Sequence, residues 1–306
     1  MSDLAHARPS TLARLATYAS VSVALVLLIA KGWSYLHSGS VAMLSSVADS
    51  ALDLLASGLN LLAVRYALSP ADEQHTFGHG KAEPLSALAQ AAFMTGSGVL
   101  VIVQAGSRFH TGAAVGDVTD GVVVMVLSII LTAVLVAFQR YVVRRTESMA
   151  IGADAMHYAG DLLMNLSVIA ALLLSSRFGI AWADPVFGIA ISVFVIANAF
   201  VIVRRAIDSL MDRELPREDR ERILAIAKKH PKVRQVHELR TRASGTQKFV
   251  QMHLVMDHGL SLLEAHRISD DVEKAVEAEY PGADIIIHED PDDIAEFHPP
   301  IGDPLH

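Results

Sequence analysis

Residues 47–67 read VADSALDLLASGLNLLAVRYA, a stretch that is long and apolar enough to cross a bilayer and yet carries two acidic residues. A membrane-spanning helix needs roughly 20 predominantly apolar residues, and ionisable side chains are costly near the centre of the bilayer. Asp49 and Asp53 are therefore expected to face the interior of a helical bundle or a water-filled cavity, where such residues usually serve function.

Further apolar stretches lie on both sides of this one. The chain has 306 residues, of which 52% are hydrophobic and 19% charged, so it is more apolar than an average soluble domain. The first apolar run ends at residues 31–33 without a small-residue cleavage pattern, so we expect it to be a span and not a removed secretory signal. The predicted spans lie near 12–33, 40–66, 82–107, 118–142, 149–176 and 182–206.

The positions of Lys and Arg predict how the spans are oriented, because positive charge is retained on the cytoplasmic side. With a cytoplasmic N-terminus, the outer segments hold only Lys31, Arg108 and Arg177. The inner segments then hold Arg8, Arg14, Arg65, Lys81, Arg140, Arg144, Arg145, Arg204 and Arg205. An even number of spans returns the chain to the same side, so both termini are expected to be cytoplasmic.

The end of the chain differs in composition from the spans. It holds more acidic than basic residues, which argues against a nucleic-acid partner because phosphates require a basic face. Its periodicities predict a helix, two strands, a second helix and a third strand. These elements are placed at 217–229, on both sides of a turn at 244–246, at 261–280 and at 284–288.

The predicted fold is therefore an all-α membrane domain of six transmembrane helices followed by a small α+β domain of αββαβ order. We assign residues 1–209 to the transmembrane domain, 210–291 to the cytoplasmic domain and 292–306 to a tail. The chain contains no Cys, so a bound metal ion must be held by nitrogen and oxygen ligands.

Two spans carry ionisable residues four positions apart. Span two has Asp49 and Asp53, and span five has His157 and Asp161 in addition to Asp154. Residues i and i+4 lie on one helix face, so each span presents a pair of ligands in one direction. Four such nitrogen and oxygen ligands suit tetrahedral Zn²⁺, whereas Ca²⁺ takes six to eight oxygens.

The alternative is a polar network or proton relay without metal. We favour the metal site because no Arg or Lys is expected deep enough in the membrane to neutralise the carboxylates. Small and polar neighbours also indicate close helix packing at this level. They are Ser46, Ser50, Ser57, Asn60, Ala153, Gly160 and Asn165.

The two four-residue spacings, the six spans and the αββαβ domain together resemble the cation diffusion facilitator family, over about residues 12–291. The chain is most similar to its bacterial zinc and ferrous-iron efflux members. The resemblance implies that Asp49, Asp53, His157 and Asp161 form the transport site, with no departure from the family pattern.

The same resemblance implies further metal ligands and a charge pair. Asp72, His75 and His79 match a metal site in the loop between spans two and three. Lys81 and Asp212 match a charge pair that ties the membrane region to the cytoplasmic domain near a dimer interface. The cytoplasmic metal site is expected to use His237, His253, His266, His288 and Asp290. In that set Asp290 or a neighbouring carboxylate is the expected bridge, and His266 is expected to act across a subunit interface. Glu289 is expected to contribute through its backbone or not at all.

The expected function is a non-enzymatic, proton-coupled antiporter of the inner membrane that exports divalent metal ions from the cytoplasm as a homodimer. Zn²⁺ is the expected ion in both transport and regulation, with Fe²⁺ and Cd²⁺ as further candidates. The partners are then the lipid bilayer, metal ions and protons. Three alternatives remain open: a membrane metal receptor without transport, a proton-coupled organic-cation exporter, and an intramembrane metal-dependent hydrolase, although no H-E-x-x-H motif is present.

Overall fold

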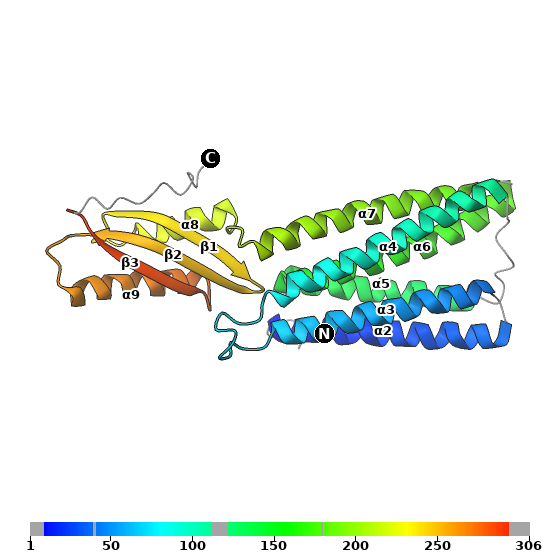
Figure 1. Ribbon diagram of the computed structural model, residues 1–306, viewed down its shortest axis with the longest axis horizontal. Helices are drawn as coiled ribbons and strands as arrows, with labels where there is room; N and C mark the ends of the chain where they lie inside the picture. The colour runs from blue at the N-terminus through cyan, green and yellow to red at the C-terminus, as the bar shows by residue number, and fades with distance from the viewer. Residues whose placement is uncertain (1–8, 39–40, 112–121, 179, 181, 294–306) are drawn as a thin grey trace. The chain divides into compact units, whose positions relative to one another are not determined.

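The computed structural model describes residues 9–38, 41–111, 122–178, 180 and 182–293 (Figure 1). Within these ranges, six helices are long and apolar enough to cross a membrane. They are α2 Pro9–Ser38, α3 Val41–Ala67, α4 Ala82–Thr111, α5 Val122–Thr146, α6 Met149–Phe178 and α7 Ala183–Leu210. The predicted six-span architecture is confirmed, while Arg8 and the predicted span residues 40 and 118–121 lie outside the described part of the chain.

The helical unit has its large apolar side chains on the outside and many of its polar side chains inside. Leucines and valines are exposed on several helices, as expected of surfaces that contact lipid. Examples are Leu55, Leu62, Val103, Val134 and Phe200. Buried positions hold Ser20, Ser57, Gln90, Gln139 and Asp154. This distribution is the reverse of a soluble protein's and leaves the polar groups to hydrogen-bond between helices.

The helices pack in a pattern that brings spans two and five together. Helix α2 packs on α3 and α5, α4 lies against α3 and α6, and α3 also contacts α6. Small side chains allow close approach, as in the buried cluster of Ala87, Ala153 and Ala206 from α4, α6 and α7. As a result, the acidic face of α3 meets the His157 face of α6.

The second unit has the predicted αββαβ order. Its elements are α8 Arg217–Ala227, β1 Gln235–Ser244, β2 Gln247–Met256, α9 Leu262–Glu279 and β3 Asp284–Pro291. The sheet order is β1-β2-β3, with β1 and β2 antiparallel and β2 and β3 parallel. The hairpin turns at Gly245, whose φ of 60° is a conformation that glycine adopts without steric cost.

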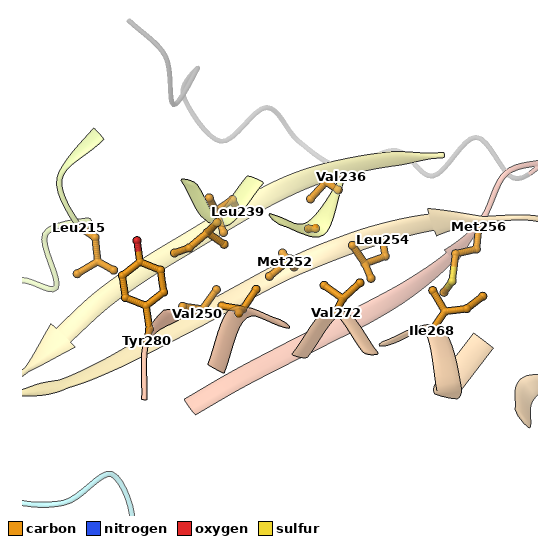
Figure 2. Close-up of a cluster of buried hydrophobic side chains, with 13 residues drawn as sticks. Leu215, Val236, Leu239, Val250, Met252, Leu254, Met256, Ile268, Val272 and Tyr280 are labelled. Atoms are coloured by element: carbon orange, nitrogen blue, oxygen red, sulfur yellow. The ribbon is translucent and has the colours of Figure 1, made fainter. Parts of the chain in front are cut away.

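One face of this sheet packs on the helices. Figure 2 shows Val250, Met252 and Leu254 along β2 with Val272 of α9 beside them, and all four belong to one buried cluster. Helices α8 and α9 also contact each other. The opposite face of the sheet is left for the residues of odd number in β2, among them His253.

The chain divides into two compact units between residues 207 and 208, close to the boundary predicted at 209 and 210. Strand β3 runs to Pro291, beyond the predicted end at His288, because its parallel pairing with β2 continues to Met256. Of the predicted tail, Asp292 and Asp293 are described, and 294–306 lie outside the described residues.

Candidate metal centres

The first candidate centre lies between α3 and α6. The His157 Nε2 atom is 3.1 Å from Asp53 Oδ1 and 3.6 Å from Asp161 Oδ2. Each of the three residues offers a ligand atom within 4.8 Å of the other two. His157 is buried, so two carboxylates and one imidazole converge inside the helical unit. That donor set fits a divalent transition metal with mixed nitrogen and oxygen ligands.

Asp49 lies on the same helix as Asp53 but is not part of this three-residue cluster. It is exposed and lines the same cavity, which has a volume of about 210 Å³ and is also bordered by the three clustered residues. All four predicted ligands therefore line one cavity. Asp53, His157 and Asp161 are close enough to share one ion, and Asp49 lies one helical turn before Asp53.

Lys31 of α2 also lines this cavity. We expected no cation near the carboxylates, and that expectation is wrong, while the position of Lys31 at the outer membrane boundary stays a prediction. The long lysine stem explains the difference, since it lets an ammonium group reach a polar site from a backbone position near the helix end. The cavity therefore contains one cationic side chain in addition to its carboxylates.

Gly160 allows α7 to approach the centre closely. A Cβ atom at this position would lie 2.9 Å from the Cγ2 atom of Val195 on α7. Gly98 on α4 is in the same situation, 2.9 Å from the Cγ1 atom of Ile196. The absence of a side chain at Gly160, which the sequence analysis noted, therefore leaves room for Val195 of α7 at this site.

The second candidate centre is in the loop between α3 and α4. His75 Nδ1 lies 3.3 Å from Asp72 Oδ1, and His79 Nε2 lies 3.2 Å from Asp72 Oδ2. Tyr66 covers the His79 ring at a centroid distance of 4.4 Å, and His79 is buried. The structure therefore brings together all three residues that were predicted here.

Backbone N–H groups of the loop stabilise the ionised form of the Asp72 side chain. The His75 backbone N–H donates to Asp72 Oδ1 at 2.7 Å and the Gln74 N–H donates to the same atom at 2.9 Å. These bonds, that of His75 first, lower the pKa of the Asp72 carboxyl below its usual value. A deprotonated carboxylate is the form that binds a metal ion.

The third candidate centre lies on the face of the second unit's sheet that is opposite its helices. The strand register places His237 opposite His253, and His253 opposite His288. Asp290 Oδ2 is 3.1 Å from His237 Nε2 and 2.9 Å from His253 Nδ1, while its Oδ1 is 3.2 Å from His288 Nε2. Asp290 therefore lies between the imidazoles and is grouped with His237 and His253 as possible ligands of one ion, and its bridging role stays a prediction.

Glu238 is a residue of this centre that the sequence did not reveal. Its Oε2 lies 3.8 Å from His253 Nε2 and 3.6 Å from Arg240 Nη2. Regular alternation would place residue 238 on the face opposite His237. The β1 register shifts between His237 and Arg240, and Glu238 has a φ of 48°, so the irregularity turns this carboxylate toward the histidines.

A fourth cluster, also absent from the sequence prediction, consists of His258, Asp292 and Asp293. His258 Nδ1 lies 2.8 Å from Asp292 Oδ1. Arg234 already pairs with Asp292 and with Asp257. Because a guanidinium neutralises this carboxylate, we assign the cluster to an ion-pair network that ties the ends of β2 and β3 together.

Comparison with known proteins identifies the chain. A model of the cation efflux transmembrane domain matches residues 17–211, and a model of the cytoplasmic domain of cation efflux proteins matches residues 215–292. The chain belongs to the cation efflux family. It is therefore a multi-pass membrane protein of a family that exports metal cations, and the second unit is its cytoplasmic domain.

Individual relatives of this family cover nearly the whole chain. The cation-efflux pump FieF of Pectobacterium atrosepticum is 46% identical over 282 residues, which is 91% of this chain and 94% of that protein. FieF of Shewanella oneidensis is 46% identical over 278 residues, with the same shares. The predicted family is confirmed.

Some solved structures match a part of this cation efflux protein. The Zn form of CzrB is 34% identical, with a TM-score of 0.27, and the match covers 28% of this chain and 99% of that one. The metal-bound C-terminal domain of CzcD from Thermotoga maritima is 26% identical, with a TM-score of 0.26, and the match covers 27% and 100%.

Two further residues expected from the family pattern, His266 and Asp212, are not among the clustered ligands. His266 is exposed on α9, with its Nε2 3.7 Å from Asp270 Oδ1, away from the row of histidines. Asp212 Oδ1 lies 3.6 Å from Arg242 Nη1 of its own unit. The roles assigned to His266 and to the pair of Lys81 with Asp212 stay predictions.

Proposed function

We propose that this cation efflux protein exports Zn²⁺ from the cytoplasm in exchange for protons, with Fe²⁺ and Cd²⁺ as further substrates. The ion is bound by Asp53, His157 and Asp161, and Asp49 completes the ligand set. The observation that carries the proposal is the convergence of His157 Nε2 on Asp53 and Asp161 at 3.1 Å and 3.6 Å within the membrane unit.

The donor chemistry supports coupling to protons. Carboxylate and imidazole groups bind a metal ion only when deprotonated, so the ion and protons compete for the same lone pairs. Imidazole titrates near neutral pH, which makes His157 the proposed main proton carrier. Zn²⁺ would bind from the cytoplasmic side to deprotonated ligands, and protons entering from the outer side would displace it.

We propose that the cytoplasmic centre senses metal and that two copies of the chain associate through this domain, whose family model is named for dimer formation. His237, His253, His288 and Asp290 would hold the regulatory ion, with Glu238 beside them. Bound metal would neutralise part of the domain's acidic charge. Both chain termini are proposed to be cytoplasmic, from the distribution of Lys and Arg.

Flux into vesicles of defined orientation tests the proposal. The purified chain is reconstituted into liposomes with an imposed pH gradient, and Zn²⁺, Fe²⁺ and Cd²⁺ uptake is compared with that of Asp49→Ala and Asp53→Ala. Zn²⁺ flux that follows the gradient and is lost in both variants is the expected result. Gradient-independent flux would contradict antiport, and retained flux in Asp53→Ala would contradict the site.

A further inference from the structure

Asp154 is a buried carboxylate of the membrane unit that the proposed transport site does not use. Asp154 lies on α6, one helical turn before His157, and its side chain is fully buried, with 0% exposure. A buried charge without partners costs several kcal/mol, so its surroundings must compensate it. Its partners therefore show what the carboxylate does.

Three neutral donors from three other helices converge on Asp154. Ser20 of α2 donates its hydroxyl to Oδ2 at 2.7 Å, and Gln139 of α5 donates its side-chain amide to the same atom at 2.6 Å. Gln90 of α4 donates its amide to Oδ1 at 2.7 Å. An ionised carboxylate is an acceptor only, so these three donors match the charged form of Asp154.

A chain of hydroxyl groups leads from Asp154 to the transport site, and proton counting gives its direction. Ser20 has one hydroxyl proton, which goes to Asp154, so in its 2.9 Å contact with Ser57 the Ser20 oxygen accepts. Ser57 thus donates to Ser20 and accepts from the Tyr158 hydroxyl at 2.8 Å. Every proton in the chain points toward the carboxylate.

Two members of this network are neighbours of the metal ligands. Ser57 lies one turn after Asp53 on α3, and Tyr158 is adjacent to His157 on α6. The network therefore links α2, α3, α4, α5 and α6 at a level directly beside the cavity. Hydrogen bonds of one orientation polarise one another, and a fully satisfied buried network selects a single packing arrangement.

We propose that Asp154 is a positioning residue of the transport site: its carboxylate holds α3 and α6 in the relative placement that lets Asp53 and His157 bind one ion. This inference rests on the proposed function of that site. Groups that orient metal ligands from outside the ligand set typically change metal affinity about 10 to 100-fold when removed. The effect is therefore expected in the Zn²⁺ concentration that gives half-maximal transport.

The decisive experiment moves the carboxylate from Asp154 to its hydrogen-bond partner Gln90. Asp154→Asn keeps the size of the side chain but replaces one carboxylate oxygen with an NH₂ group, which cannot accept a hydrogen bond from an amide donor such as that of Gln90. We therefore expect KM for Zn²⁺ to rise about tenfold or more, with a smaller change in maximal rate. Adding Gln90→Glu restores a carboxylate that accepts from the new amide. The double variant is expected to recover most of the wild-type KM, which a general packing defect would not do.

A second pair of variants decides the question if Asp154→Asn does not fold, as judged by gel filtration and thermal melting in detergent. Ser20→Ala removes a donor to Asp154 and is expected to raise KM. Thr17→Ala is the matched control, because Thr17 is a buried hydroxyl on the same helix that bonds only to the Arg14 carbonyl in the contacts described. Equal KM values for these two variants would overturn the inference.

The result also separates this inference from the proposed function. Zn²⁺ flux in the wild type that is lost in Asp53→Ala, together with an unchanged KM in folded Asp154→Asn, overturns only the role of Asp154. Absence of flux in the wild type, or full flux in Asp53→Ala, overturns the proposed site itself.

Discussion

His157 Nε2 lies 3.1 Å from Asp53 Oδ1, although 104 residues separate them in the chain. This contact joins the two helices that each carry a four-residue pair of ionisable groups. It converts two separate one-helix patterns into a site with an imidazole between two carboxylates, since Asp161 also lies 3.6 Å from the same nitrogen.

Replacing the imidazole should change which ions the site accepts. His157→Asp makes the predicted ligand set all oxygen, and carboxylates favour Mn²⁺ over softer ions whereas imidazole suits Zn²⁺. We expect Zn²⁺ transport to fall relative to Mn²⁺ transport in competition assays with reconstituted vesicles. An unchanged Zn²⁺ preference would indicate that His157 does not touch the ion.

Introducing a methyl group at Gly160 should push α7 away from the cavity. The new Cβ would lie 2.9 Å from Val195 Cγ2, and such overpacking costs about 1 to 3 kcal/mol. We expect Gly160→Ala to lower the melting temperature in detergent and to slow transport, with recovery when Val195→Ala is added.

Gly152→Ala is the control for this variant. Gly152 lies on the same helix, but nothing within 4 Å would meet its Cβ. Its melting temperature should stay unchanged or rise, because alanine favours helix over glycine. Equal destabilisation by both substitutions would show that the approach of α7 at Gly160 is not the cause.

Asp290→Asn should weaken metal binding at the cytoplasmic centre, because both oxygens of Asp290 face histidines. Asp290 Oδ2 faces His237 and His253, and its Oδ1 faces His288. We expect Zn²⁺ affinity of this domain to fall at least about tenfold in calorimetry on the intact chain. Asp284→Asn, at the start of the same strand, should leave binding unchanged, and equal losses in the two variants would contradict a bridging role.

Stability at the start of α9 should depend on pH through Glu264. Ser261 donates its side-chain and backbone groups to the Glu264 carboxylate in a capping box, and these bonds lower the pKa of Glu264 below its ordinary value of 4.5. The folded state thus favours the ionised form. This stabilisation is present above pH 4.5 and is lost as the pH falls through the lowered folded-state pKa.

Hydrogen exchange measures this effect at the first amides of α9. Protection factors should decrease below pH 4.5 in the wild type, and Glu264→Gln should remove that pH-dependent step. Glu273→Gln, an exposed change on the same helix, should behave as the wild type. A step that persists in Glu264→Gln would assign it to another group.

Much of the architecture could be predicted because it follows from local patterns. Apolar length specified the six spans, and the alternation of Val250, Met252 and Leu254 predicted a strand with one face on the core. The family resemblance added the loop and cytoplasmic ligands, and the structure brings Asp72, His75 and His79 together. The roles of these residues in transport stay predictions.

Other features could not be predicted because they depend on a departure from regular geometry or on a neighbour distant in sequence. Glu238 joins the histidines only because β1 has an irregular register there. Lys31 reaches the cavity from the end of its helix. Asp154 has no visible partner in its own span, and its donors come from α2, α4 and α5.

The sequence by itself determined the membrane class, the order of elements and the faces on which Asp49, Asp53, His157 and Asp161 lie, since helix and strand periodicities depend only on local geometry. The tertiary structure alone decided which faces meet, that three of these four residues cluster while Asp49 stands one turn away, and that Asp154 is held by three other helices. The physical reason is that side-chain distances between helices follow from packing, which residue spacing along one helix does not specify.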